Sequence, residues 1–499
     1  MADQPNILFI VSDQMTAALT GVYGHPVVKT PHLERLATDG VRFDSAYTPF
    51  PLCAPGRACL MTGRHASAIG AWDNGCLTTA DQPTFAHYAE MAGYDAVLSG
   101  KMHFVGPDQL HGFRRRLTTD IYTADFSWVR EEWIGIKETK GKDCEEVMSQ
   151  RSMYNSQSYV GDGVEIGKWH NALAYDEETH HRAIGYLRAK ADRGDGPFLL
   201  TASYHHPHEP FHAPHSFWDM YDGEEIAIPE FPDDLEQTYS MMDRNLNAYH
   251  GRTRYDLRDP DSLRRVRRAY YALTTYMDEK VGELLDVLEE TGLADNTAVI
   301  FCSDHGDMLC EKEMVQKRNF YEPSCRVPLI VRFPDKWEAG TTHETPVSLL
   351  DLVPTFAELC GKSDMLPHDG ESLVGQINNG DADRIVFSQA HEAIGMPCVM
   401  ARQGRYKYNY IHGYDDQLFD VEADPGEWTN LVGTPQYHGV GERLRKAILD
   451  AFDPDWMEQE NMESLLRRRL VRDVNVKHGR SWAHRVEWDP RKGAAGQYF

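Results

Sequence analysis

The chain has 499 residues and a formal net charge of −26 at neutral pH. A chain of this length can bury a large core, and its length favours one big domain together with a smaller one. The acidic balance argues against nucleic acid or an anionic membrane as a partner, whereas a small anionic substrate is compatible with a local group of cations.

The first residues and the cysteines indicate the compartment. Met1 leads directly into the apolar run 6–11 without a basic segment or a cleavage site, and no apolar run is long enough to span a bilayer. The nine cysteines are an odd set without paired spacing, which favours a reducing environment over a disulfide framework. We therefore expect a cytoplasmic protein without a membrane partner.

Short apolar runs alternate with helical patterns up to about residue 382. Five runs have the composition of buried strands: 7–11, 96–99, 198–203, 298–302 and 329–333. The clearest amphipathic segment spans 267–291, where apolar residues recur at helical spacing and Gly292 can cap the end. Strands separated by helices predict a mainly parallel sheet with helices on both faces.

The pattern changes near residue 383. Three closely spaced runs predict strands of an antiparallel sheet: 385–389, 399–403 and 406–411. Helical patterns follow over 441–452 and 457–471, and we expect an extended tail over 473–499. The predicted fold is therefore α/β, with a large, mainly parallel sheet sandwiched by helices over 1–382 and a smaller α+β subdomain with an antiparallel sheet over 383–499.

Residues with metal-binding chemistry follow two of the predicted strands. Asp13 and Gln14 end the first strand, and Asp304, His305 and Asp307 follow a later one. In open α/β sheets ligands bind beyond the carboxyl ends of the strands, and carboxylate, amide and imidazole groups suit a divalent cation. For either site alone, an aspartate that caps a helix or forms a turn is the simpler interpretation. We expect Asp307 to lie behind the ligands or at the surface.

A lysine and several histidines follow two further strands. Lys101 and His103 can both face one pocket, because residues two apart in extended backbone point the same way. The alternative for such a pair is a surface lysine and a hydrogen-bonded core histidine. Downstream of 198–203, one pocket-facing histidine is expected from three candidates: His205, His206 and His208. Two histidines of a polar helical segment are expected at the surface: His180 and His181.

The pentapeptide Cys53-Ala54-Pro55-Gly56-Arg57 resembles the C-x-P-x-R signature by which sulfatases mark one cysteine for oxidation to formylglycine. The hydrated aldehyde offers one oxygen that attacks sulfur or phosphorus and a second that later expels the bound oxyanion. Three fixed positions in five also arise by chance, and in that case Cys53 is a buried thiol, Pro55 the first residue of a helix (N1) and Arg57 a surface cation.

Further segments extend the resemblance over most of the chain. The runs 93–101 and 304–307, together with the pentapeptide, look like those of the formylglycine-dependent sulfatases of the alkaline-phosphatase superfamily. Other runs look nearly identical to segments of the choline sulfatases in this family or continue the similarity: 99–113, 116–128, 301–309, 326–329 and 422–427. The resemblance implies an alkaline-phosphatase-like fold in which 1–382 is the catalytic domain.

The resemblance also implies a role for each matching residue. One divalent cation, calcium or else manganese, is implied to bind beside formylglycine, and its ligands would be Asp13, Gln14, Cys53, Asp304 and His305. The catalytic residues that it implies are Cys53, Arg57, Lys101, His103, His208 and Lys317. In this set Arg57 steadies the hydrated aldehyde, and the two lysines hold the sulfate. One histidine, His103, is the base that helps to restore the aldehyde, and the other, His208, protonates the leaving alcohol.

Four positions correspond to the choline pocket of the family: Asn74, Trp128, Tyr154 and Glu392. Trp128 could hold a quaternary ammonium through a cation–π contact and Glu392 through its charge, with core packing as the alternative for Trp128. Tyr154 stands where choline sulfatases have a histidine, and the sequence ends without their longer acidic tail, which reaches a neighbouring subunit. Both departures concern the leaving group rather than the sulfate chemistry.

The predicted function is hydrolysis of a small sulfate ester, of the alkyl type of choline sulfate, through formylglycine 53 and a divalent cation. The implied partners are this ester, a formylglycine-generating enzyme that acts on Cys53, and further copies of the chain in a homo-oligomer. Two alternatives stay open: a phosphonate monoester or phosphodiester hydrolase with the same apparatus, and a non-catalytic binding protein that keeps Cys53 as a thiol.

Overall fold

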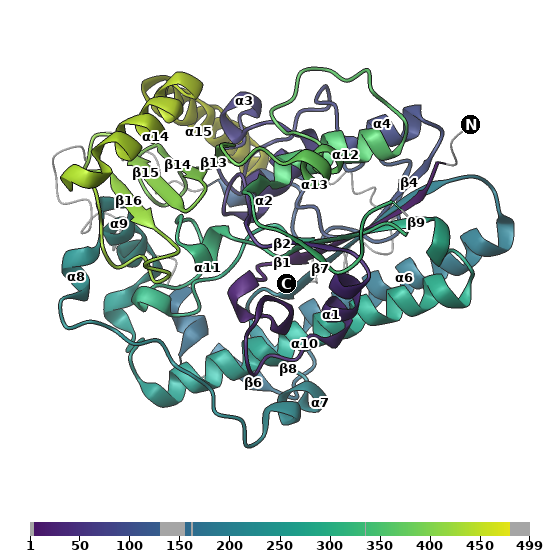
Figure 1. The fold of residues 1–499 in the computed structure, drawn as a ribbon, viewed down its shortest axis with the longest axis horizontal. Helices are drawn as coiled ribbons and strands as arrows, with labels where there is room; N and C mark the ends of the chain where they lie inside the picture. The colour runs from purple at the N-terminus through teal and green to yellow at the C-terminus, as the bar shows by residue number, and fades with distance from the viewer. Residues whose placement is uncertain (1–3, 130–154, 161–162, 335, 480–499) are drawn as a thin grey trace.

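The computed structural model describes residues 4–129, 155–160, 163–334 and 336–479. Its centre is an eight-stranded sheet in the order β11-β2-β10-β9-β1-β7-β4-β5 (Figure 1). The strands of this sheet are β1 (Asn6–Asp13), β2 (Val41–Phe43), β4 (Asp95–Gly100), β5 (Arg115–Arg116), β7 (Phe198–Pro207), β9 (Thr297–Ser303), β10 (Leu329–Arg332) and β11 (Thr341–His343). β10 runs antiparallel to both of its neighbours, and the remaining pairs are parallel. The predicted α/β class is confirmed, and each of the five predicted strands is present.

Helices cover both faces of this sheet, because the side chains on both faces of the central strand β1 are buried. Ile7, Phe9 and Val11 of β1 point into one core, and Leu8 and Ile10 point into the other. The first core is closed by α2 (Cys53–Thr62), α4 (Phe85–Met91), α12 (Leu352–Leu359) and α13 (Leu373–Asn379). The second is closed by α1 (Pro31–Thr38), α6 (Asn171–Arg193) and α10 (Pro260–Glu290), on the opposite side of the sheet in Figure 1.

The long helix α10 begins earlier than the predicted segment 267–291. Asp259 caps its first turn, because its side chain accepts a hydrogen bond from the backbone N–H of Ser262 at 2.9 Å, and Pro260 occupies the first helical position. The hydrophobic periodicity therefore located the buried stripe of this helix, whereas the capping residues set its start.

A second sheet follows in the C-terminal quarter. It contains four antiparallel strands, β13 (Val386–Ala390), β14 (Cys398–Gln403), β15 (Tyr406–Ile411) and β16 (Gln417–Asp420). Helix α14 (His438–Ala451) packs on this sheet through Leu444 and Ile448, which meet Val399, Tyr408 and Leu418 in one core. The antiparallel sheet is confirmed, with β16 as an additional strand. The domain boundary at residue 382 stays a prediction.

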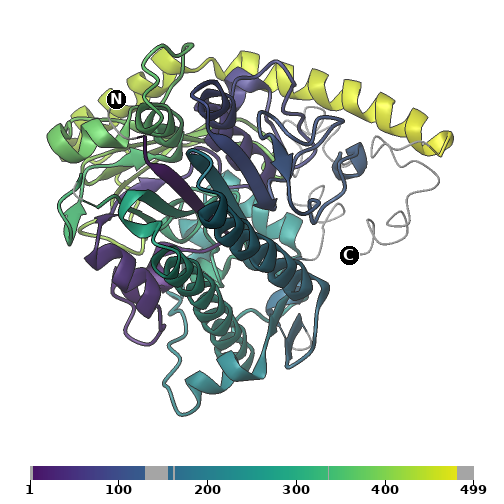
Figure 2. The ribbon, with the colours of Figure 1, turned by 90° about the vertical axis from the view of Figure 1, so that its right-hand side faces the viewer.

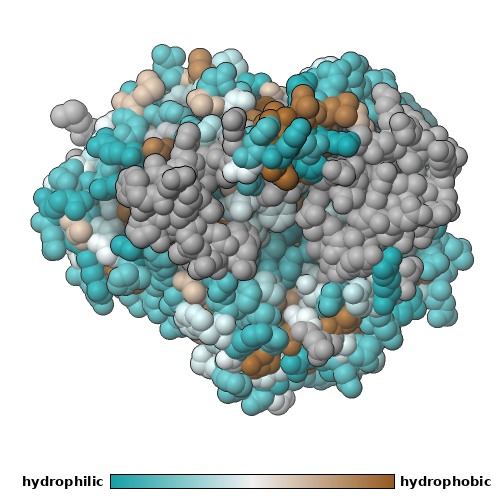
Figure 3. Space-filling model, turned by 180° about the vertical axis from the view of Figure 1, so that it is seen from behind, coloured by the Kyte–Doolittle hydropathy of each residue, from teal (hydrophilic) through white to brown (hydrophobic). Residues whose placement is uncertain are grey.

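The last described helix, α15 (Pro454–Lys477), extends beyond its neighbours (Figure 2). The expected extended tail is wrong for its first residues, because α15 continues to Lys477, and residues 480–499 lie outside the described part of the chain. Among the described residues, no helix combines the length and the apolar character needed to cross a membrane. Where described residues are visible on the face opposite to that of Figure 1, the surface is mainly hydrophilic, with a hydrophobic patch near the top of the view (Figure 3).

Short elements connect these layers. They are β3 (Ala46–Tyr47) with its partner β12 (Val347–Ser348), β6 (Val164–Ile166) with its partner β8 (Phe211–Ala213), α3 (Ala66–Ile69), α7 (His215–Trp218), α8 (Leu235–Thr238), α9 (Met241–His250) and α11 (Glu322–Cys325). β8, α7, α8 and α9 lie in the segment 211–261, for which the sequence shows little periodicity.

Candidate active site

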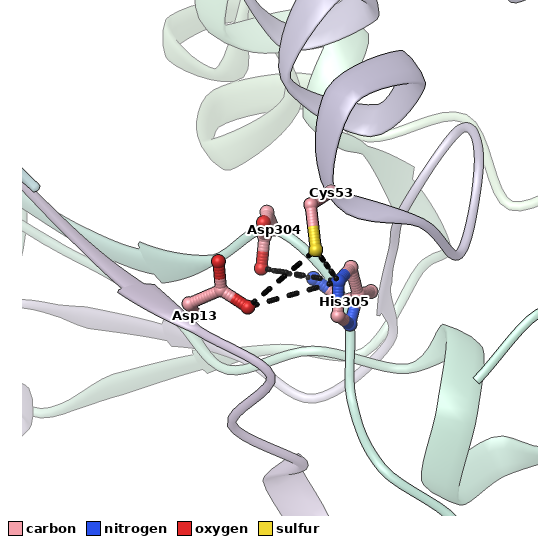
Figure 4. A group of neighbouring side chains, drawn as sticks. All are labelled: Asp13, Cys53, Asp304 and His305. Atoms are coloured by element: carbon pink, nitrogen blue, oxygen red, sulfur yellow. Dashed lines mark hydrogen bonds and ion pairs between the residues drawn. The ribbon is translucent and has the colours of Figure 1, made fainter. Parts of the chain in front are cut away.

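Four buried side chains from separate segments meet at the carboxyl edge of the large sheet. Asp13 ends β1, and Asp304 and His305 follow β9, which is its parallel neighbour with Ser12 in register with Ser303. Cys53 is the first residue of α2 and points at this edge (Figure 4). One ligand atom from each of Asp13, Cys53, Asp304 and His305 lies within 4.8 Å of the others. The parallel pairing of β1 and β9 therefore brings the two predicted ligand segments together.

The start of α2 depends on a glycine of the signature pentapeptide. Leu52 has extended backbone, and the helix begins at Cys53, so Pro55 is the third helical residue. A side-chain carbon on Gly56 would come within 2.7 Å of the carbonyl oxygen of Phe50. Gly56 thus lets the helix turn back tightly on the preceding chain, which directs Cys53 toward the sheet edge.

The distances within the cluster suit shared ligation. Cys53 Sγ lies 3.2 Å from His305 Nε2 and 3.8 Å from Asp13 Oδ1. His305 Nε2 is 3.8 Å from one carboxylate oxygen of Asp13 and of Asp304. His305 Nδ1 lies 3.0 Å from the carbonyl oxygen of Gly306, a contact that favours a proton on Nδ1 and a free lone pair on Nε2. Two carboxylates and an imidazole aimed at one point form a fitting donor set for a divalent cation.

Two buried cations neutralise the carboxylates from behind. Arg57 donates from Nε to Asp304 Oδ2 at 2.7 Å and from Nη2 to Asp13 Oδ2 at 3.1 Å, and Lys101 forms an ion pair with Asp13. Burial alone would raise the pKa of Asp13, but the neighbouring cations, Lys101 foremost, bring it well below its usual range. Arg57 is 0% exposed, which rules out the surface-cation alternative for the pentapeptide.

The thiol of Cys53 is protonated in this setting. Burial, and then the charge of Asp13, raises its pKa to about 11. A cysteine thiol is nucleophilic only as the thiolate, so the unmodified residue 53 is a poor nucleophile at neutral pH. The eight cysteines among the described residues are free and buried, which agrees with the predicted absence of a disulfide framework there.

Gln14 lies beside the cluster and differs from the other predicted ligands in its contacts. Its side-chain oxygen contacts the ammonium of Lys317, and its nitrogen donates to Asp307 and Glu209. Asp307 is fully buried and also accepts from Tyr159, so it lies behind the ligands rather than at the surface. Gln14 would therefore have to release Lys317 in order to ligate a cation.

Lys101 and His103 both lie at the site, although not for the reason that the sequence suggested. His103 has a φ of 57°, so the segment is not extended there. Asp120 holds the turn instead, because its Oδ2 accepts from the backbone N–H groups of Met102 and His103 at 3.0 and 2.8 Å. Burial and the charge of Lys101 lower the pKa of His103 to about 3. Asp120 is a functional residue that the sequence analysis missed, since no local motif marks it.

Of the three candidate histidines on β7 and its end, His208 contacts another predicted catalytic residue. His208 Nε2 lies 2.9 Å from the ammonium of Lys317, and burial together with this charge lowers the pKa of His208 well below its ordinary value. His206 is instead bound to Asp176, with 2.6 Å between Nδ1 and Oδ2. His205 contacts the carbonyl oxygen of Glu209 at 3.3 Å.

The surface assignment is correct for His181 and wrong for His180. His180 is 4% exposed and contacts the hydroxyl of Tyr204 at 2.8 Å and the carboxylate of Glu283. It faces β7 and α10 from α6, so tertiary packing buries a residue whose local sequence is polar.

The described positions expected to bind the alcohol make separate contacts: Asn74 and Glu392 lie beside the start of α2, and Trp128 lies beside His103. Asn74 Oδ1 accepts from the backbone N–H of Ala54 at 3.0 Å, and the backbone N–H of Asn74 donates to Glu392 Oε2 at 2.8 Å. The ring of Trp128 packs against His103 and Tyr122, with centroid distances of 5.5 and 5.1 Å.

Tyr154 is the last position expected to bind the alcohol, and Arg318 is a neighbour of Glu392 that the sequence analysis did not predict. Tyr154 lies outside the described residues. Arg318, which the sequence analysis did not single out, forms a buried ion pair with Glu392 at 2.8 Å. A partner 74 positions away leaves no local signal for this pair in the sequence.

The matches to known proteins agree with this geometry. Residues 5–362 match the family model described as Sulfatase. The chain belongs to the sulfatase family. Residues 310–453 of this sulfatase also match the model described as N-sulphoglucosamine sulphohydrolase, C-terminal. The protein is thus an enzyme of the sulfuric ester hydrolase class.

Individual relatives span almost the whole sulfatase. It is 41% identical to the choline-sulfatase of Rhizobium meliloti (strain 1021), over 99% of this chain and 96% of the relative. It is 27% identical to an arylsulfatase of Clostridium perfringens (strain 13 / Type A), over 90% of this chain and 95% of the relative.

Solved structures confirm the alkaline-phosphatase-like fold. The phosphonate monoester hydrolase from Silicibacter pomeroyi superposes with a TM-score of 0.71 at 22% identity, covering 90% of this chain and 95% of the other. A 2-O GAG sulfatase superposes with a TM-score of 0.69 at 23% identity, covering 92% and 93%. Likeness at this level of identity concerns the fold.

Proposed function

We propose that this sulfatase hydrolyses a small alkyl sulfate ester, of the choline-sulfate type, with formylglycine formed from Cys53 as its nucleophile. The observation that carries the proposal is the buried cluster of Asp13, Cys53, Asp304 and His305, backed by the cations of Arg57 and Lys101. The match of residues 53–57 to the C-x-P-x-R signature supports the conversion of Cys53.

A divalent cation completes the site in this proposal. Asp13, Asp304 and His305 would hold it beside residue 53, and Gln14 would join them after releasing Lys317. When bound, the cation supplies positive charge that polarises a sulfate oxygen and stabilises the charge that develops on it. Oxygen ligands and a single imidazole suit calcium, with manganese as the alternative.

The chain's own residues orient the nucleophile and bind the sulfate. Arg57 fixes both metal-binding carboxylates through its two hydrogen bonds and also donates to the carbonyl oxygen of Lys101 at 2.8 Å. Lys101 and Lys317 offer ammonium groups to the sulfate oxygens, where preorganised charge stabilises the transition state. Neutral His103, held by Asp120, is placed to accept a proton when the aldehyde is restored.

Proton transfer to the leaving alcohol involves His208 and Lys317 together. His208 is neutral at neutral pH because of its lowered pKa, and its Nε2 accepts from the Lys317 ammonium. The Lys317 charge that lowers this pKa also makes protonated His208 a strong acid, so in this proposal His208 passes a proton taken from solvent to the leaving oxygen while Lys317 keeps its charge for the sulfate. The contact of His208 Nδ1 with the carbonyl oxygen of Glu209 at 2.7 Å fixes the ring for this transfer.

A phosphonate monoester or phosphodiester hydrolase is the second candidate, favoured by the likeness in fold to the Silicibacter pomeroyi enzyme. The two functions are separated by hydrolysis rates for sulfate and phosphonate esters of the same alcohol. We expect kcat/KM to be higher for the sulfate ester. A higher value for the phosphonate ester would overturn the proposal and support the second candidate.

Three further parts of the hypothesis stay predictions. They are the cytoplasmic location, the homo-oligomer, and the formylglycine-generating enzyme that would act on Cys53.

A further inference from the structure

A buried ion pair borders the nucleophile on the side of Asn74. Arg318 donates from Nε and Nη2 to Glu392 Oε1 at 3.1 and 2.8 Å, and Oε2 of Glu392 accepts from the backbone of Asn74. Arg318 also donates from Nη1 to Gln316 Oε1 at 2.8 Å. The two side chains are only 6% and 3% exposed. Both oxygens of the Glu392 carboxylate are therefore engaged by donors of the protein itself.

The pair lies within a few contacts of residue 53. The backbone N–H of Arg318 donates to the carbonyl oxygen of Pro51 at 3.0 Å, and Arg318 directly follows Lys317 in the chain. On the other side, Asn74 links Glu392 to the backbone N–H of Ala54, next to Cys53. The ion pair is therefore hydrogen-bonded to the segment that carries residue 53 on both sides of that residue, and in the inference below it forms one wall of the pocket for the alcohol.

Electrostatics decides which alcohol such a wall favours. A buried carboxylate without a partner attracts a quaternary ammonium strongly, because screening by water is weak there. The ion pair of a carboxylate with a guanidinium has no net charge, so it attracts a cation much less than a free carboxylate does. The rings of Trp128 and Tyr122, which pack together at 5.1 Å, offer apolar surface that suits alkyl groups.

We propose that Arg318 neutralises Glu392 and thereby sets the leaving-group pocket to favour esters of uncharged alcohols over esters of quaternary ammonium alcohols. The inference rests on the proposed sulfatase function and names the charge class of its substrate. It assigns Glu392 to the protein's own ion pair, in place of the cation-binding role that the resemblance implied.

The test uses two sulfate esters of equal size. Choline sulfate carries a quaternary nitrogen, and 3,3-dimethylbutyl sulfate has carbon in the same place. The ratio of their kcat/KM values isolates the effect of charge, because shape and leaving-group geometry are shared. For the native enzyme we expect the neutral ester to be the better substrate. Equal kcat/KM values or a native preference for choline sulfate would overturn the inference.

Four variants then assign the effect to the pair. Arg318→Met frees the carboxylate and should raise the choline-to-neutral ratio about tenfold or more, since unit charges a few ångströms apart interact strongly in a buried site. Arg318→Lys, the matched control, keeps the charge and should leave the ratio near the native value. Glu392→Gln leaves an unpaired guanidinium and should lower the ratio. The double variant Arg318→Met with Glu392→Gln removes both charges and should restore it.

The test still decides the question if one variant fails to fold, because the variants shift the choline-to-neutral ratio in opposite directions. Glu392→Gln and the double variant are sufficient without Arg318→Met, because the first must lower the ratio and the second must return it. A ratio unchanged in all folded variants would reduce the pair to a structural role and refute the inference. Failure of the proposed function gives a different result: enzyme with a verified aldehyde at residue 53 and bound cation would hydrolyse neither ester.

Discussion

Replacement of Arg57 by glutamine tests how the charges of the site are balanced. Arg57 is fully buried, donates to both Asp13 and Asp304, and donates from Nη1 to Ser203 Oγ at 2.8 Å as well. Without Arg57, the buried carboxylates of Asp13 and Asp304 face each other. Among the described contacts, Lys101 is then the buried lysine that still pairs with Asp13. Breaking a buried pair by removal of one partner costs about 3–5 kcal/mol, because the remaining charge stays desolvated.

The assay is urea unfolding in EDTA, which removes stabilisation by bound cations from the comparison. We expect Arg57→Gln to lower the apparent free energy of unfolding by about 3–5 kcal/mol. The matched control is Arg114→Gln, because the Arg114 side chain is 57% exposed and pairs with Glu90 at 2.7 Å. Exposed pairs contribute about 0–1 kcal/mol. If the two variants lose the same free energy, Arg57 does not balance the carboxylates, and the electrostatic account of the site is wrong.

Three other substitutions test the metal, the proton transfer and the alcohol pocket. Asp304→Asn should abolish both bound divalent cation, measured by elemental analysis, and turnover; full occupancy would locate the cation elsewhere. His208→Gln should slow alkyl sulfates about 10²- to 10⁴-fold, the usual contribution of a general acid, and activated aryl sulfates much less. Equal losses on the two ester types would mean that His208 only binds or packs. Trp128→Ala should weaken binding of neutral and cationic alkyl sulfates alike, because the paired Glu392 leaves packing as the main contribution; a loss larger by about 0.5–2 kcal/mol for the cationic ester would restore the choline-binding role.

The sheet and the metal cluster could be predicted because both follow from local patterns. β1 and β9 read as buried apolar runs, and parallel strands place their carboxyl ends at one edge. Asp13 and Asp304 therefore had to lie close together, although 291 positions separate Ser12 from Ser303, the last paired residues before them. The pentapeptide gave Cys53 by resemblance, and the position of α2 explains how the thiol reaches this edge. The cluster of Asp13, Cys53, Asp304 and His305 is thereby established, whereas the cation in it stays a prediction.

Features that depend on tertiary contacts could not be predicted in the same way. The left-handed backbone of His103 is held by Asp120, 17 positions away, so the assumption of extended backbone was wrong. His180 is buried because Tyr204 and Glu283 approach it from other elements. Arg318 gives no local sign of its partner Glu392, which lies 74 positions away.

The start of the C-terminal tail was also mispredicted. The periodic apolar pattern weakens after residue 471, yet α15 continues to Lys477. Charged contacts such as Arg469 with Asp473, at 3.6 Å, support this last part of the helix, where the apolar side chains of Leu470 and Val474 remain exposed.

The mass of the peptide that contains residue 53, isolated from active enzyme, tests the central claim most directly. We predict a mass lower than that of the cysteine peptide by the difference between a thiol-bearing CH₂ group and an aldehyde, with turnover proportional to the aldehyde fraction across preparations. Cys53→Ala should fold and show no turnover. Full activity in enzyme whose residue 53 is entirely unmodified cysteine would contradict the account.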